Sequence, residues 1–313
     1  MKKALCLVLA LCMAFALCAC GSASKELTFG TGGESGTYYA FGTVIAQQVS
    51  SKTDTKITAV SSGGSQANIE DIAAGAIQLG FSQSDVMAYA YNGERLFEAP
   101  VKDFSAVAGL YMEQVQIVTT NPDIKTVADL KGKNVSVGAL GSGTYFNALD
   151  ILGAYGMVED DIKSQYLSFG DSADGLKDGK IDAAFVVAGA PTVAITDLAT
   201  GKDVYLVSLD DEHIANLLAS SPYYAANTIS ADTYGLDSDC KTVAVGAIVL
   251  AKNDVAEDAV YNFLSATFDN LDELTASHAK GAELNLEFAS SVTAVPYHPG
   301  AVKYFAEKGI TVK

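Results

Sequence analysis

The sequence predicts an α/β protein of two lobes joined by a hinge, with mainly parallel sheets. From residue 27 onward, apolar strand-like runs alternate with helix-like patterns, which is typical of parallel sheets covered by helices. The tetrapeptide Ser-Gly-Thr-Tyr occurs at residues 35–38 and again at 142–145, each time between a glycine-rich turn and a helical pattern. Two extended segments near 112–120 and 240–250 would connect the halves, a geometry associated with closure around a ligand.

The N-terminal segment has the pattern of a lipoprotein signal peptide. Lys2 and Lys3 precede an apolar run at 4–17, which is too short to span a bilayer comfortably. The sequence Leu-Cys-Ala-Cys at 17–20 matches the bacterial lipoprotein cleavage box. We therefore expect a signal peptide at 1–19, a lipid anchor on Cys20 and a tether at 20–26. The alternative is an ordinary cleaved signal without lipid.

Composition limits what the exported body could bind. Hydrophobic residues make up 49% and charged residues 18%, so large cores can form. Cys240 would be the remaining cysteine of the body, which excludes an intramolecular disulfide. Loss of Lys2 and Lys3 leaves 18 basic against 37 acidic residues, a net charge of −19. Such a surface does not bind nucleic acid or an anionic bilayer by charge, so membrane attachment would depend on lipid.

The first lobe is expected at 27–118 and 246–313. Its predicted strands are 27–30, 56–61 and 77–81, followed by extended segments at 104–111 and 115–119. Its predicted helices are 39–49 after the first Ser-Gly-Thr-Tyr, 66–75 with Gly75 as C-cap, and 86–91, which ends at Asn92 and Gly93. The β-branched run at 242–250 crosses back from the second lobe. Helices at 256–268, 271–280 and 298–308 complete the chain.

The second lobe is expected at 119–245. A short helix at 126–132, capped by Thr126, precedes a strand that leads to the second Ser-Gly-Thr-Tyr and its helix. A strand at 166–169 and a short helix at 171–179 follow. A buried strand at 181–187 then leads to a helix that starts near Pro191, and a strand at 204–208 is the last of the lobe.

These stretches together resemble the TAXI family of TRAP-transporter solute-binding proteins. The similar stretches lie at 32–39, 79–85, 91–93, 129–138, 141–148, 167–174, 176–183, 188–191, 242–245 and 298–301. The resemblance implies a two-lobed periplasmic-binding fold of the Venus flytrap type, type 2 like. It further implies delivery of a small organic solute, often a carboxylate or amino acid, to TRAP permease subunits driven by an ion gradient. We expect the protein to be a monomer. The anchor would place it on the outer face of the bacterial cytoplasmic membrane.

Residues of the two glycine turns are the main candidates for the ligand site. Helix N-termini offer free N–H groups and the positive end of the dipole, which suits anions. Tyr38 and Tyr39 would form an aromatic wall, unless one of them packs inward. Asp85 is either the partner of a ligand ammonium or only the acidic first turn of a helix. The expected ligand-binding residues are Ser35, Gly36, Thr37, Tyr38, Tyr39, Ser62, Gly63, Gln83, Ser84, Asp85, Ser142, Gly143, Thr144, Asn147 and Gly189.

The chain contains one arginine, Arg95, which lies apart from the glycine motifs. An Arg–carboxylate clamp is therefore not expected, and backbone amides and hydroxyls would hold an anionic ligand. A glutamate-like amino acid is expected ahead of a simple dicarboxylate, because Asp85 would repel a pure dianion.

Motifs of enzymes are not recognised in the body of the chain. His213, His278 and His298 share no metal-ligand spacing, and residues 141–144 do not form a nucleophile elbow. We expect no catalytic residues, no metal and no cofactor. A ligand-presenting sensor lipoprotein and, further off, an exported hydrolase remain as alternatives.

Overall fold

The computed structural model describes residues 26–313. The predicted signal peptide, the Cys20 anchor and nearly all of the tether lie outside the described residues. Within 26–313, no helix is both long and apolar enough to cross a membrane.

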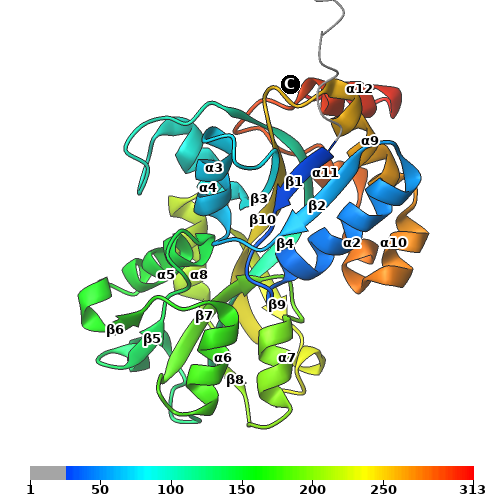
Figure 1. The fold of residues 1–313 in the computed structure, drawn as a ribbon. Helices are drawn as coiled ribbons and strands as arrows, with labels where there is room; N and C mark the ends of the chain where they lie inside the picture. Colours follow the sequence, from blue (N-terminus) through cyan, green and yellow to red (C-terminus); the bar gives the residue numbers. More distant parts are fainter. Residues whose placement is uncertain (1–25) are drawn as a thin grey trace, which may run out of the picture.

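One mixed β-sheet runs through both lobes (Figure 1). Its strand order is β2-β1-β3-β10-β4-β7-β5-β6, with β8 paired to β4 and β9 paired to β10. The strands are β1 (Glu26–Gly30), β2 (Lys56–Val60), β3 (Leu79–Gln83), β4 (Phe104–Thr119), β5 (Asn134–Ser136), β6 (Lys163–Gln165), β7 (Ala183–Ala188), β8 (Tyr205–Leu206), β9 (Ala225–Ile229) and β10 (Cys240–Lys252).

Helices surround each half of the sheet, with the N- and C-terminal helices in one half and the middle of the chain in the other (Figure 1). The first group comprises α2 (Thr37–Lys52), α3 (Ser65–Ala73), α4 (Ser84–Asn92), α9 (Glu257–Phe268), α10 (Leu271–Ser277), α11 (Leu286–Ala289) and α12 (Pro299–Glu307). The second comprises α5 (Gly143–Ala154), α6 (Phe169–Lys177), α7 (Val193–Ala199) and α8 (Asp211–Ser220). Short 3₁₀ helices are η1 (Val127–Leu130), η2 (Glu159–Asp161), η3 (Ala231–Thr233) and η4 (Ala279–Glu283).

The strands β4 and β10 connect the halves. They pair antiparallel from Phe104 with Lys252 to Gln114 with Ala244, with irregularities in register at Ala247/Ile248 and Val249/Leu250. Inside each half the pairs β1–β2, β1–β3, β5–β6 and β5–β7 are parallel. The α/β prediction of two lobes is confirmed, and parallel pairing dominates away from the two connecting strands. The expectation of separate extended segments at 104–111 and 115–119 is wrong, because β4 is one continuous strand.

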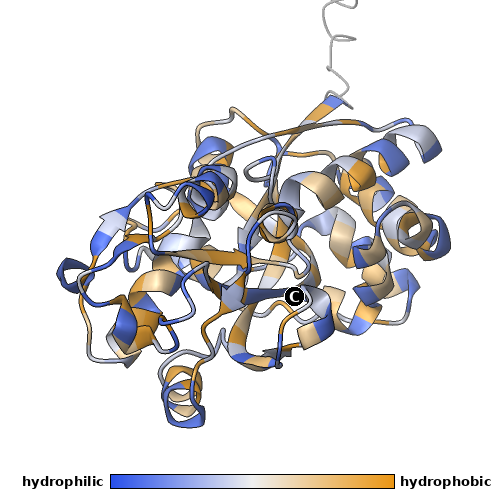
Figure 2. Cartoon of the chain, turned by 90° about the horizontal axis from the view of Figure 1, so that it is seen from below, coloured by the Kyte–Doolittle hydropathy of each residue, from blue (hydrophilic) through white to orange (hydrophobic). Residues whose placement is uncertain are grey.

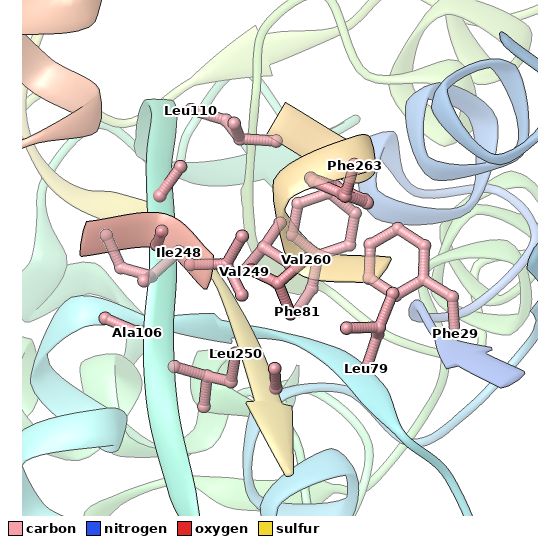
Figure 3. Packing of buried hydrophobic residues seen from close by; sticks show 14 of the residues in the cluster. Phe29, Leu79, Phe81, Ala106, Leu110, Ile248, Val249, Leu250, Val260 and Phe263 are labelled. Atoms are coloured by element: carbon pink, nitrogen blue, oxygen red, sulfur yellow. The ribbon is translucent and has the colours of Figure 1, made fainter. Parts of the chain in front are cut away.

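Each half has its own hydrophobic core. The first packs rings and aliphatic side chains of β1, β3, β4, β10 and α9, including Phe29, Phe81 and Phe263 (Figure 3). The second half has two clusters, one around β5, β7 and α5 and the other between β7, α6 and α7. The helix α2 shows how the sequence specifies this packing, because its buried side chains recur at the four-residue spacing of a helix face. Orange and blue alternate around the outer helices in Figure 2, as expected for helices with one buried face.

Predicted helix ends agree with the structure where a glycine or a capping side chain next to the helix determines the end. Gly75 and Gly93 adopt positive φ values of 75° and 72° just after α3 and α4. Thr126 forms a capping box with Asp129 at the start of η1. His298 caps α12, accepting a hydrogen bond from Gly300 N at 3.2 Å.

One predicted strand position needs correction, and one strand has no counterpart in the prediction. The strand expected at 166–169 is β6 at Lys163–Gln165, since the N-cap Ser168 already starts α6 at Phe169. The strand β9 was not predicted, because most of its residues are exposed and it lacks an apolar pattern.

Candidate functional site

A cleft between the two halves encloses a cavity of about 70 Å³, lined by residues of both. Four helices begin at its wall: α2 after Gly36, α3 after Gly64, α5 after Ser142 and α6 after Ser168. Each N-terminus carries the positive end of a helix dipole, equivalent to roughly half an elementary charge. Their convergence makes this part of the cleft favourable for a negatively charged group.

The halves touch across the cleft through hydrogen bonds near its wall. The Thr37 hydroxyl donates to the carbonyl of Gly189 at 2.8 Å, and Ala194 N donates to the carbonyl of Ser35 at 3.2 Å. Ala67 N donates to the carbonyl of Gly141 at 3.1 Å. Because each of these bonds joins a residue of one half to a residue of the other, the cleft is in a closed arrangement.

The structure brings nine of the predicted site residues into the cavity wall. They are Gly36, Thr37, Tyr38, Ser62, Gly63, Gln83, Ser142, Gly143 and Thr144. Ser35 lines an adjoining depression at the mouth of the cleft, together with Ser62.

Five predicted residues do not line this cavity: Tyr39, Ser84, Asp85, Asn147 and Gly189. Of these, Ser84 accepts a hydrogen bond from Gly246 N at 3.0 Å, and Gly189 accepts one from Thr37. Tyr39 is half-buried on α2.

Asp85 and Asn147 meet in a buried polar network beside the cavity. Asn147 Nδ2 donates to Asp85 Oδ2 at 2.9 Å and lies 2.8 Å from Tyr224 Oη. The Tyr224 hydroxyl donates to Asp150 Oδ2 at 2.9 Å, and Asp150 Oδ1 pairs with Arg95 at 2.6 Å. The network thus connects α4 and the loop after it with α5, across the boundary between the halves.

Burial raises the pKa of Asp85 from 3.8 to about 7, chiefly by desolvation, with the Asp150 charge adding to it. Below about pH 4 this carboxyl is neutral in both the folded and unfolded chain. Between about pH 4 and 7 the unfolded chain loses the proton and the folded chain keeps it, so stability falls as pH rises.

Asp85→Asn is therefore expected to change the pH dependence of stability. Asparagine keeps the shape of the side chain and cannot ionise. As the pH rises, the free energy of unfolding of the wild type should therefore fall relative to that of the variant. The expected relative loss between pH 4 and 8 is on the order of 2–4 kcal/mol. Urea unfolding of both proteins at several pH values measures it, and a constant difference across this range would contradict the raised pKa.

Glu113 is the one acidic residue among the cavity residues that sequence reasoning missed. It lies on β4 opposite Val245 of β10, where the two strands pass between the halves, and it is 1% exposed. Desolvation raises its pKa to about 8, against hydrogen bonds from Gln83 and Tyr38 that lower it. The sequence signal that could have found this residue is a single acidic residue between two apolar strand segments. A buried carboxylate inside a long strand is normally unfavourable, so such a position stands out.

Tyr38 connects the aromatic core to Glu113. Its ring stacks on Phe81 at 4.4 Å between centroids, and Phe81 stacks on Phe29 at 4.9 Å. The Tyr38 hydroxyl donates to Glu113 Oε2 at 3.2 Å. The first-lobe core therefore fixes a hydroxyl against the carboxyl group in the cleft.

Cationic side chains are not part of the cavity wall within residues 26–313. Arg95 is engaged with Asp150. Lys280 is buried behind the wall, where Nζ donates to the carbonyl of Ala190 at 2.9 Å and pairs with Glu283 at 2.6 Å. In the described part of the chain, no cluster of His, Cys, Asp or Glu could hold a metal ion.

A family model, described as the NMT1-like family, matches residues 29–309. The chain belongs to this family. The match covers both halves of the fold and every residue of the cavity wall.

Solved structures share the fold at low sequence identity. The alkanesulfonate-binding protein SsuA from Xanthomonas axonopodis pv. citri bound to MOPS aligns over 94% of this chain and 96% of its own, with 16% identity and a TM-score of 0.51. A putative L-cystine ABC transporter protein from Listeria monocytogenes aligns over 87% and 100%, with 15% identity and a TM-score of 0.51. An ancestral arginine-binding protein bound to arginine aligns over 81% and 98%, with 15% identity and a TM-score of 0.50. This member of the NMT1-like family therefore has the two-lobed fold of periplasmic solute-binding proteins.

Proposed function

We propose that this chain is an extracytoplasmic solute-binding lipoprotein, anchored through Cys20, that captures a small organic acid or amino acid between its lobes. The observation that carries the proposal is the convergence of four helix N-termini on one enclosed cleft between halves joined by β4 and β10. Helix N-termini hold carboxylates without an arginine, and the cavity wall contains neither arginine nor lysine within residues 26–313. A ligand that contacts both halves would stabilise the closed arrangement.

We further propose that the captured solute is delivered to a TRAP-type permease. This step rests on the resemblance of the sequence motifs to the TAXI family, because the solved structures share only the fold. One of those structures is of a protein described as a putative L-cystine ABC transporter, so an ABC-type permease is the competing partner. Uptake into membrane vesicles distinguishes them: a TRAP-type permease would require an ion gradient, and an ABC-type permease would require ATP.

The capture step predicts that the protein carries a small acid and closes around it. Mass spectrometry of solute released from purified protein should identify an organic acid or amino acid. Small-angle scattering should then show a smaller radius of gyration with that solute than without it. An unchanged radius at saturating solute, or the absence of any acid that binds, would contradict capture between moving lobes.

A further inference from the structure

We propose that Glu113, together with Gln83, selects solutes that carry an ammonium group, so that the cleft takes amino acids in preference to simple organic acids. This rests on the proposed function and names the solute class of the same site. A second part follows from charge balance: the neutral Glu113 carboxyl gives up its proton to solvent as the ligand ammonium takes its place.

Donor and acceptor groups lie side by side in this cavity. The helix N-termini at Gly36, Gly64, Ser142 and Ser168 offer positive dipole ends and hydroxyl donors. The Glu113 carboxyl group and the Gln83 amide are buried in the same wall, and a Cβ atom on Gly143 at the start of α5 would lie 2.0 Å from Gln83 Oε1. An α-amino acid carries its carboxylate and its ammonium on one carbon atom, so it matches a site where both kinds of group lie close together.

Gln83 supplies an independent observation. Its side chain is 2% exposed, and no donor within residues 26–313 reaches its Oε1 atom. A buried acceptor without a donor costs free energy, so a ligand N–H group at this place would be favourable. An ammonium has three donors and can satisfy Gln83 Oε1 and Glu113 together, whereas a hydroxyl offers one donor.

The groups around Glu113 determine its charge without a ligand. Tyr38 of α2 and Gln83 of β3 hydrogen-bond to it, and Lys280 of η4 favours its ionised form from a distance. Asp85 of α4 opposes ionisation, and the neighbouring Tyr111 of β4 is neutral. Desolvation outweighs the favourable contacts, and the pKa of Glu113 is raised to about 8. At pH 7 the carboxyl is mostly protonated, and an ammonium in contact with it makes the ionised form the favoured one.

The step is balanced in protons and charge. The Glu113 O–H bond breaks and the proton leaves to buffer, while the positive charge of the ligand ammonium pairs with the new carboxylate. Binding of an amino acid should therefore release up to about one proton at pH 7 and progressively less as the pH rises above 8, where Glu113 is already ionised without the ligand. A solute that lacks an ammonium should release no proton from Glu113.

The experiment uses calorimetry on the purified protein. The twenty standard amino acids are screened by thermal shift, and the best binder is compared with its 2-hydroxy analogue. Titrations at pH 7 in two buffers of different ionisation enthalpy, neither of them a phosphate nor a primary amine, give the number of protons released. The variants are Glu113→Gln, which keeps the size of the side chain, and Asp85→Asn, which removes the other buried carboxyl group nearby.

The expected result has three parts. The wild type binds the amino acid at least about 30-fold more tightly than the hydroxy acid and releases a proton. Glu113→Gln loses both the preference and the proton release, while its affinity for the hydroxy acid stays close to that of the wild type. Asp85→Asn retains both.

Other outcomes overturn the inference in distinguishable ways. Equal affinity of the wild type for both solutes, without proton release, removes the role of Glu113 and leaves acid capture intact. Loss of preference in Asp85→Asn with retention in Glu113→Gln would assign the ammonium to Asp85. If neither amino acids nor hydroxy acids bind, the proposed function fails as well.

Discussion

Gly143→Ala is expected to weaken solute binding by about 5- to 150-fold with little loss of stability. A Cβ atom on Gly143 would lie 2.0 Å from Gln83 Oε1, 2.4 Å from Gln83 Cδ and 2.8 Å from Ser65 Oγ. The N-terminus of α5 could then approach the first half only if these side chains moved. Overpacking of this kind costs about 1–3 kcal/mol, and here the cost falls on the closed arrangement. The backbone of Gly143 is not in the left-handed region, so alanine itself introduces no backbone strain.

Gly153→Ala is the matched control, since it lies in the same helix and an added Cβ meets no atom within 4 Å. Titration calorimetry should give wild-type affinity for Gly153→Ala and weakened affinity for Gly143→Ala. Small-angle scattering should show that Gly143→Ala closes less at equal solute occupancy. Wild-type affinity and full closure of Gly143→Ala would mean that the close contact at Gly143 is not part of the bound state.

Phe81→Ala is expected to lower the free energy of unfolding by about 3–5 kcal/mol and to weaken solute binding in addition. Phe81 is fully buried between the rings of Phe29 and Tyr38 (Figure 3 shows its place beside Phe29). The cavity left by its removal costs stability, and Tyr38 loses the surface that holds its hydroxyl against Glu113. Urea unfolding gives the first effect, and calorimetry on the folded fraction gives the second.

Phe268→Ala serves as the comparison, because Phe268 belongs to the same core and contacts Tyr304 rather than Tyr38. It should lose stability and keep wild-type affinity. If the two variants bound solute equally well, the stack of Tyr38 on Phe81 would have no role in shaping the cleft.

The repeated Ser-Gly-Thr-Tyr allowed the sequence to predict the starts of α2 and α5, because capping and glycine turns are local chemistry. The turn before α3 entered the predicted site through Ser62 and Gly63, whereas the start of α6 did not. Ser168 reaches the cleft through the pairing of β5 with β6, which no short motif encodes.

Asp85 and Glu113 show a second limit of sequence reasoning. Asp85 stood at a strand end and a helix start, where ligand-binding residues are common, yet its side chain points into the network with Asn147. Glu113 lies between two apolar runs that the sequence pattern predicts as separate segments, so its position resembles a polar connection. Only the continuity of β4 places this carboxyl group in the cleft.

The central position of β10 bears on when the chain can fold. This strand comes late in the sequence, yet it lies between β3 and β4, and its residues 247–251 pair with 79–83. The N-terminal half therefore cannot complete its sheet until the chain has been made as far as residue 252. Pairing over such a separation is slow, because the loop-closure entropy is lost before the contacts form. A growing chain with this topology remains incomplete through most of its synthesis, and an incompletely folded chain is the form that can be threaded through a membrane before the sheet closes.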